Sequence, residues 1–237
     1  MNSREMHYDV KVKLNKVDSQ QYANLQVPEI DWALNGAQDI FIKNKAQPRN
    51  YNGQGFEFNK RLTEDLRTLV VEREILTTSV FTDGISYVCS IPSNYMFFVS
   101  AEALISKEDC VDKIGKIYIV QHDDRAEQSP FDRSSFEWRE VNTRMYEDKF
   151  RLFTDGTFTV GELQLNYLRH PAYIHAAGNF RGGSYTLPGS VTLTGFQDCE
   201  LPEHTHREIT DLAVLLLTGE MQIPDYQIKL NKIQLNN

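Results

Sequence analysis

The sequence is poor in cysteine: its 237 residues include only Cys89, Cys110 and Cys199, and none of these belongs to a CxxC pair. An odd number of widely spaced cysteines without a secretion signal is typical of reduced thiols in a cytoplasm and argues against a disulfide scaffold. We therefore expect each cysteine to be a small core residue and not a nucleophile.

Long apolar runs and an excess of positive charge are also missing. No stretch of about 18 apolar residues occurs, so the sequence predicts no membrane-spanning helix. The opening MNSREMHYDVKVKLNK lacks the apolar core of a signal peptide. Lys and Arg number 25 against 33 Asp and Glu, a net charge of −8 at pH 7. This balance argues against a reader of duplex DNA, which needs clustered cations.

Recognised catalytic fingerprints are absent as well. The phosphate-binding patterns GxxxxGK(S/T) and GxGxxG and the nucleophile pattern GxSxG do not occur, so RGGS at 181–184 is interpreted as a flexible turn. Arginines alternate with aromatic residues between 136 and 169, but acidic residues intervene and favour a surface of mixed sign. The arginines concerned are Arg139, Arg144, Arg151 and Arg169.

Two groups of residues have side chains that suit a metal ion. Cys199 precedes His204 and His206, and thiolate and imidazole are preferred zinc ligands. On a helix, however, side chains two positions apart in the sequence point about 200° apart around the axis, so the rings of His204 and His206 would face different directions. The second group is the run His122–Asp124 after an expected strand, which suits a metal or acid–base chemistry. We interpret both groups as solvated or packed residues and predict no catalytic, cofactor-binding or metal-binding residue.

What the sequence contains is an ordinary globular composition, with 41% hydrophobic and 24% charged residues. Apolar residues recur at helical spacing in three early segments. The first begins near Ser3 and runs to about residue 17, and the second, DWALNGAQDIFIKNK, covers residues 31–45. The third runs over residues 58–70. Small residues at 33, 36 and 37 would let another helix approach the second one closely.

From about residue 76 the pattern changes to β-branched and aromatic runs separated by turn signals. Turns are expected at DG (83–84), PSN (92–94) and DKIG (112–115), a long loop at 122–140, and a Gly-rich loop or hairpin at 180–190. These runs predict a mostly antiparallel β region.

The last part returns to helix, which is expected to end at Gly219 as a C′ residue. This helix is apolar nearly all round, so it must be covered on more than one side. The tail after it alternates apolar and polar residues over 224–235. Such a tail is either an arm on a neighbouring subunit or an edge strand of its own sheet. We predict one α+β domain over 1–237, with a helical part (1–75), a β-rich insertion (76–200) and a C-terminal helix and tail (201–237).

Two stretches resemble head–tail connector proteins (adaptors) of tailed bacteriophages, in particular the ring proteins below the portal in crAss-like phages. One is DWALNGAQDIFIKNK, which follows the short helix that begins MNSRE. The other joins a strand of the type L-Y-(I/L)-R-x-P to an acidic helix of the type E-L-P-x-x-x-H-x-E-I-x-x-x-A-V. Its matching residues are Tyr167, Leu168, Arg169, Pro171, Glu200, Leu201, Pro202, His206, Glu208, Ile209, Ala213 and Val214.

The resemblance implies a structural virion protein without catalysis or cofactor, located at the head–tail junction and assembled in the host bacterial cytoplasm. Such proteins form a ring, typically of twelve copies, that docks to the portal, contacts other tail or ring proteins and extends the DNA channel. Double-stranded DNA would only pass through this channel, without sequence-specific binding, and no membrane is involved.

A ring requires one patch of each copy to meet a different patch of the next. We expect the helix at 203–218 and the tail to supply one patch and the first two helices the other. The residues expected at these interfaces are Trp32, Gly36, Phe41, Leu212, Leu215, Leu216, Tyr226, Ile228 and Leu230. Two alternatives stay open at this point: a cytoplasmic metal-dependent hydrolase, and a tail-terminator or tail-completion protein.

Overall fold

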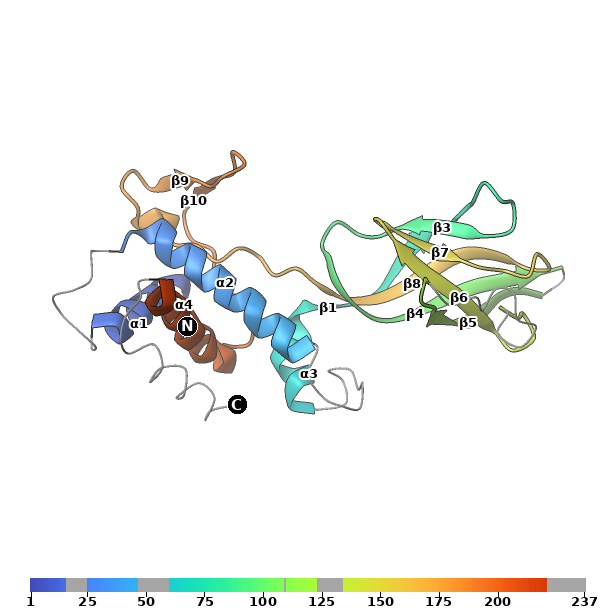
Figure 1. Cartoon of the computed structure of the whole chain (residues 1–237), viewed down its shortest axis with the longest axis horizontal. Coiled ribbons are helices and arrows are strands. Elements are labelled where there is room, and N and C mark those ends of the chain that lie inside the picture. Colours follow the sequence, from blue (N-terminus) through green and yellow to red (C-terminus); the bar gives the residue numbers. More distant parts are fainter. Residues whose placement is uncertain (16–24, 47–59, 109, 123–133, 221–237) are drawn as a thin grey trace. The chain divides into compact units, whose positions relative to one another are not determined.

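A computed structural model describes residues 1–15, 25–46, 60–108, 110–122 and 134–220 of the chain. The chain divides into two compact units, Met1–Leu69 with Pro171–Asn237, and Val70–His170. The first unit is mainly helical and the second holds a large sheet (Figure 1). A mostly antiparallel sheet is thus inserted between N-terminal helices and a C-terminal helix, which confirms the predicted α+β class. The expectation of a single domain over 1–237 stays a prediction.

The helical unit contains helices, short 3₁₀ turns and one small hairpin. In chain order they are α1 (Ser3–Asn15), α2 (Val27–Ala46), α3 (Lys60–Leu66), η2 (Arg67–Leu69), η4 (Ala177–Asn179), β9 (Ser184–Thr186), β10 (Thr192–Thr194), η5 (Glu203–Thr205) and α4 (His206–Glu220). The strands β9 and β10 pair antiparallel, which confirms the hairpin expected at 180–190.

The first helix begins with a capping box formed by Asn2 and Glu5. The side-chain oxygen of Asn2 accepts the Glu5 N–H at 2.8 Å, and the Glu5 carboxylate accepts the Asn2 N–H at 2.9 Å. Each side chain thereby satisfies a backbone donor that the first helical turn leaves free. Ser3, the first residue of the helix, lies buried and donates its N–H to Asp198 at 2.7 Å.

Helix α4 packs against both α1 and α2 (Figure 1). Its residues Ile209, Ala213 and Leu217 are buried, as are Met6 and Val10 of α1. Contact with two helices of its own chain explains why α4 is apolar on nearly every side. The helix includes Gly219, so the expected end at that residue is one residue too early.

The third helix is shorter than predicted. It ends at Leu66, a 3₁₀ turn follows, and Val70 already opens a strand. Two successive β-branched residues, Val70 and Val71, favour extended backbone, and both pair with a neighbouring strand, which overrides the helical spacing of the segment.

The second unit contains eight strands. They are β1 (Val70–Thr77), β2 (Ser79–Val80), β3 (Tyr87–Ser90), β4 (Tyr95–Lys107), β5 (Cys110–Ile119), β6 (Glu140–Tyr146), β7 (Lys149–Leu152) and β8 (Thr159–Arg169). Their order in the sheet is β1-β8-β4-β5-β6-β7-β3-β2, and every pair is antiparallel except β5 with β6. The strand β6 was not predicted, because its segment directly follows the polar stretch expected as a loop at 122–140.

The two ends of this sheet are one continuous stretch of chain. Thr78 alone joins β1, which pairs with β8, to β2, which pairs with β3. The Thr78 hydroxyl donates to the Val160 carbonyl at 2.5 Å, which fixes this corner. The sheet therefore closes on itself around one buried cluster that includes Ile105, Phe150 and Leu163. Within the described residues, β1 pairs only with β8 and β2 only with β3, so the two ends of the sheet are joined by the chain at Thr78 and not by a ladder.

The turn expected at DKIG (112–115) is wrong, because β5 runs straight through it. The chain reverses earlier, where Lys107 pairs with Cys110 and Glu108 has a φ of 47°. Gly115 serves close packing: a Cβ there would lie 3.3 Å from the Ile105 side chain. The glycine at 115 is therefore explained by close packing in the core and not by a turn.

We expect Tyr167→Phe to lower the free energy of unfolding by about 1.5–3 kcal/mol, the range for a hydrogen bond to a charged group. The Tyr167 side chain is buried, and its hydroxyl donates to the Glu74 carboxylate at 2.6 Å and lies 2.8 Å from Asn94 Oδ1. Urea unfolding measures the change. The matched control is Tyr118→Phe at a half-exposed site of the same sheet, and equal losses in the two variants would contradict the prediction.

We also expect stability to fall at high pH. Burial raises the pKa of Tyr95 to about 12, and burial with the Glu74 carboxylate raises the pKa of Tyr167 to about 12. Above pH 10 the unfolded chain ionises these tyrosines while the folded chain keeps them protonated. Their contribution is thus complete below about pH 10 and is lost as the pH rises through about 12. Urea midpoints that stay constant up to about pH 11 would contradict this expectation.

Candidate interaction surfaces

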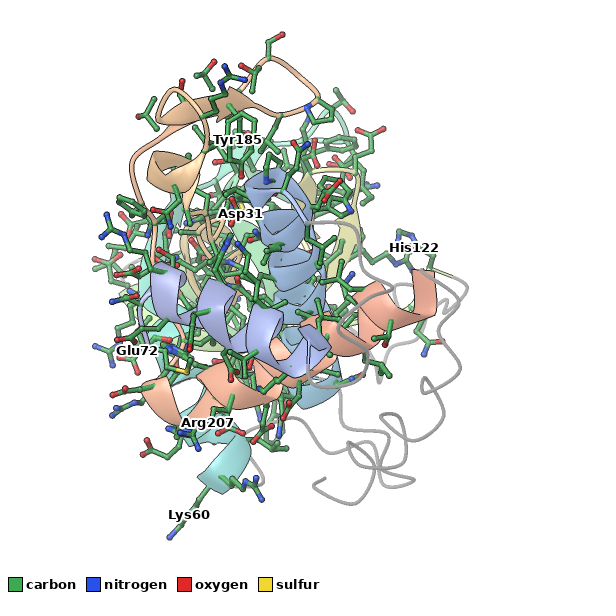
Figure 2. All side chains as sticks on the ribbon, turned by 90° about the vertical axis from the view of Figure 1, so that its left-hand side faces the viewer. Asp31, Lys60, Glu72, His122, Tyr185 and Arg207 are labelled. Atoms are coloured by element: carbon green, nitrogen blue, oxygen red, sulfur yellow. The ribbon has the colours of Figure 1, made fainter. Side chains whose placement is uncertain are left out.

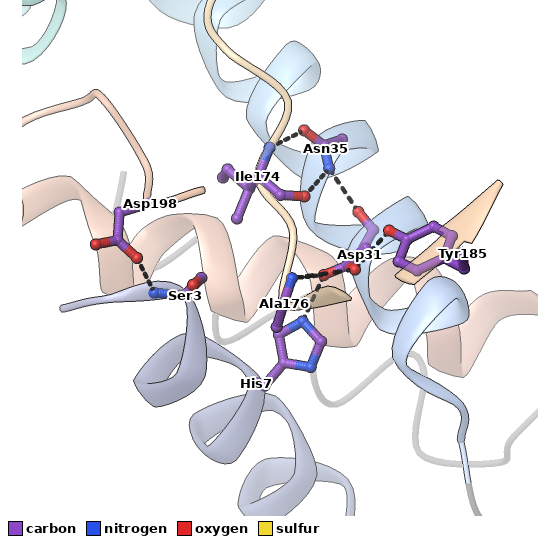
Figure 3. Close-up of polar contacts among 8 residues, drawn as sticks. All are labelled: Ser3, His7, Asp31, Asn35, Ile174, Ala176, Tyr185 and Asp198. Atoms are coloured by element: carbon purple, nitrogen blue, oxygen red, sulfur yellow. Dashed lines mark hydrogen bonds and ion pairs between the residues drawn. The ribbon is translucent and has the colours of Figure 1, made fainter. Parts of the chain in front are cut away.

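A buried carboxylate, Asp31 on α2, ties four segments of the helical unit together (Figure 3). Its Oδ1 lies 2.5 Å from Nε2 of His7 on α1, and its Oδ2 accepts the Tyr185 hydroxyl of β9 at 2.6 Å. The Ala176 N–H lies 3.2 Å from both oxygens. Tyr185 reaches from the hairpin toward Asp31 (Figure 2). A carboxylate without solvent contact needs this many donors to offset its desolvation.

Neighbouring contacts extend this network along α2. The Asn35 side chain bridges to the Ile174 backbone in both directions, donating to its carbonyl at 2.7 Å and accepting its N–H at 2.8 Å. Burial and the Asp31 carboxylate raise the pKa of Tyr185 well above its usual value, so this hydroxyl remains a donor. All these groups are enclosed and mutually satisfied, so the cluster fixes the hairpin and α1 on α2 and offers no site to a ligand.

A second polar cluster joins α1 to α4. The Lys13 ammonium contacts Asp9 at 2.5 Å, Asp211 at 2.9 Å and the Thr210 hydroxyl at 2.8 Å. Thr210 in turn donates to Asp9 at 2.6 Å. Burial alone would raise the pKa of Asp9, but Lys13 and Thr210 outweigh it and hold that pKa below the usual value. The charges of the two helices are thus complementary along their contact.

The histidines and cysteine considered for zinc do not form a site. The His204 ring is exposed and lies 2.8 Å from Asp65, whereas His206 is buried and lies 2.8 Å from the Leu201 carbonyl. Burial raises the pKa of the Cys199 thiol to about 11, so it is not a thiolate at neutral pH. Among the residues that the structure describes, no group of three or more His, Cys, Asp or Glu side chains is placed to hold a metal.

The other residues considered as candidates in the sequence are His122, with the two aspartates that follow it, and the arginines near aromatic residues. His122 is exposed (Figure 2) and lies 2.8 Å from the Met145 carbonyl, while Asp123 and Asp124 are outside the described residues. Arg151 pairs with Asp83 at 2.7 Å and lies between the rings of Phe81 and Phe153.

The three cysteines differ in their surroundings. Burial raises the pKa of Cys89 to about 12, as suits a core thiol. Cys199 is half-buried. Cys110 is exposed, so the prediction of a core residue is wrong there. Its position explains this, because it directly follows the turn between β4 and β5.

One groove lies on the sheet-bearing unit, over β4, β5 and the turn at 138–139. Its volume is about 530 Å³, and it is lined by Phe98, Val99, Ser100, Ala101, Glu102, Ile114, Lys116, Ile117, Trp138 and Arg139. The Trp138 side chain is 80% exposed, more than any other large hydrophobic residue that the structure describes. Sequence reasoning placed Trp138 in a mixed-sign loop and missed this groove, since its walls come from segments far apart in the chain.

Comparison with known protein families identifies the family of the chain. The profile of the family described as phage tail ring protein 3/4 matches residues 1–223. The chain belongs to this family of crAss-like phage ring proteins. Among curated individual proteins, no sequence matches it.

Membership of this family settles several expectations. The ring protein is a phage tail component and hence a virion protein, as the resemblance implied. The family is structural and not an enzyme family, which confirms the prediction of no catalysis and removes the hydrolase alternative. No described helix of the ring protein is long and apolar enough to cross a membrane.

The expected interface residues of the ring protein lie in different surroundings. Trp32 is 63% exposed, and Leu212, Leu215 and Leu216 are partly exposed. Gly36 faces α4, because a Cβ there would lie 3.5 Å from the Leu216 side chain, and the small residue does permit close approach of another helix as predicted.

The remaining expected residues are not on the described surface. Phe41 is buried in its own unit, beneath the Lys45 ammonium. Tyr226, Ile228 and Leu230 lie outside the described residues. The part these residues play between copies stays a prediction.

We expect Tyr185→Phe to lower the free energy of unfolding by about 1.5–3 kcal/mol, because a charged, buried acceptor loses a donor. Thermal or urea unfolding measures it. Tyr8→Phe on α1 is the matched control, since Tyr8 is 71% exposed and should change stability by less than about 0.5 kcal/mol. Similar stabilities of Tyr185→Phe and the unmodified protein would show that the hairpin is held without this bond.

Proposed function

We propose that the ring protein assembles into a closed ring of twelve copies that docks to the portal and joins capsid to tail. The ring extends the channel through which double-stranded DNA passes, without sequence-specific contact. Its other partners are further ring or tail proteins, and assembly takes place in the cytoplasm of the host bacterium. The tail-terminator or tail-completion reading is the alternative within virion structure.

The observation that carries this proposal is an apolar surface that the helical unit leaves open. Trp32 on α2 is largely exposed although it adjoins the buried Asp31, and Leu212 and Leu215 on α4 are only partly covered. In a head-to-tail ring each copy presents two different patches. The exposed leucines of α4 with the tail (224–235) supply one, and the exposed parts of α1 and α2 around Trp32 supply the other.

The charge of the chain supports the same function. A net charge of −8 gives DNA no general attraction to the protein, because attraction would require cations that neutralise phosphates. A channel wall of this kind lets DNA slide without being retained.

The decisive experiment is the solution mass of the purified protein, alone and mixed with a portal, by light scattering or mass photometry. We expect a species of twelve protomers of 27.4 kDa each, formed either spontaneously or on addition of the portal. A monomer under both conditions would overturn the proposal.

We further expect the double variant Trp32→Gln with Leu215→Gln to weaken assembly while leaving the fold intact. Each large apolar side chain buried at an interface contributes roughly 1.5–3 kcal/mol, so the concentration needed for assembly should rise by about tenfold or more. Leu217 is unsuitable because it is 5% exposed, and Leu216 because it packs on Gly36.

The matched control for this variant is Tyr8→Gln, which alters an exposed aromatic residue on α1. Circular dichroism verifies the fold of each variant. Unchanged assembly of the double variant would remove this surface from the interface.

A further inference from the structure

The ladder between β4 and β5 stops halfway along the two strands. Their pairing runs from Lys107 with Cys110 only to Glu102 with Lys116. Beyond that point β4 remains paired with β8, and β5 pairs with β6 from Lys116 to Ile119. Within the described part of the chain, the facing edges of β4 (98–101) and β5 (117–119) therefore have no ladder partner. The sheet therefore has a gap between two strands that pair with each other further along.

The groove lies at this opening. Its floor includes Phe98 and Ala101 of β4 and Ile117 of β5, and Trp138 and Arg139 form a wall. The aromatic ring of Trp138 is left in solvent, and Ile114 beside it is 54% exposed. An extended peptide can add a strand where a strand edge offers free backbone groups and exposed apolar side chains lie beside it. Both features are present at this groove.

We infer that this groove binds the C-terminal tail of a second copy of the chain, with residues 226–230 inserted as an extended strand. The inference rests on the proposed ring and changes one contact within it: residues 226–230 of the tail meet the sheet-bearing unit of the neighbour, while the leucines of α4 face the surface around Trp32. The tail's backbone pairs with the free edge of β4, and its apolar side chains cover Trp138 and Ile114.

The sequence of the tail fits this groove. Tyr226, Ile228 and Leu230 alternate with polar residues, so an extended conformation places all three on one side. The five residues 226–230 match the short free edge of β4.

The length of the tail allows it to reach a neighbour. Residues 221–225 link Glu220 to the inserted segment, and at about 3.3 Å per residue this link spans about 20 Å when extended. The family match ends at residue 223, so the arm lies almost wholly beyond the part shared with the family.

The test is a disulfide cross-link in the full-length protein. Ser100→Cys on the groove and Ile228→Cys on the tail are introduced together in a Cys110→Ser background, which removes the exposed native thiol. We expect oxidation to join chains into a ladder of multimers on a non-reducing gel. The matched control carries Thr77→Cys in place of Ser100→Cys, at an exposed position of β1, and should give far less product.

Each outcome decides the inference. Linked multimers support it. A disulfide within one chain would show that the groove holds its own tail, and would overturn the inference. Rings seen by mass photometry without any link would overturn it while leaving the proposed function standing. A monomer without links would overturn both.

Discussion

The helical unit depends on one desolvated negative charge, the Asp31 carboxylate. Its three donors come from α1, from residue 176 and from the hairpin strand β9, and they lie up to 154 residues from Asp31 in the sequence. Removing any donor leaves the buried carboxylate with fewer hydrogen bonds, which costs free energy. The hydrogen bonds to Asp31 therefore hold all of these segments in position. The adjacent Trp32 is consequently presented from a rigid part of α2, as suits a residue proposed to contact a neighbouring copy.

Much of this fold could be anticipated from residue patterns. Helical spacing identified α1, α2 and α4, and β-branched runs identified the sheet between them, because both patterns record which side chains face a core. The features that were missed are those whose local sequence is typical of a different structure from the one adopted in the folded chain. Strand β6 directly follows a polar stretch that has the residues of a loop. Gly115 is a residue typical of turns, but it occupies a crowded position opposite Ala103.

The interaction surfaces were harder to anticipate. Asp31 stands three residues before the buried Leu34 and seven before the buried Gln38, so its place on the buried stripe could have been noticed. Its partners His7 and Tyr185 could not, since only the folded chain brings them to it. The groove beside Trp138 exists because the pairing of β4 with β5 ends at Glu102 and Lys116. The register of two strands cannot be predicted from the sequence of either strand alone. Family membership, by contrast, followed from short motifs near both ends of the matched region.

The way the chain enters and leaves the sheet has a mechanical consequence. Val70, the first residue of β1, is paired with Leu168 near the end of β8, so both crossings between the two units occur at neighbouring points of one strand pair. A force that pulls the units apart is therefore shared by two covalent connections in parallel, and the sheet itself is not stretched from one end to the other. Such a joint passes load through the paired ends of β1 and β8.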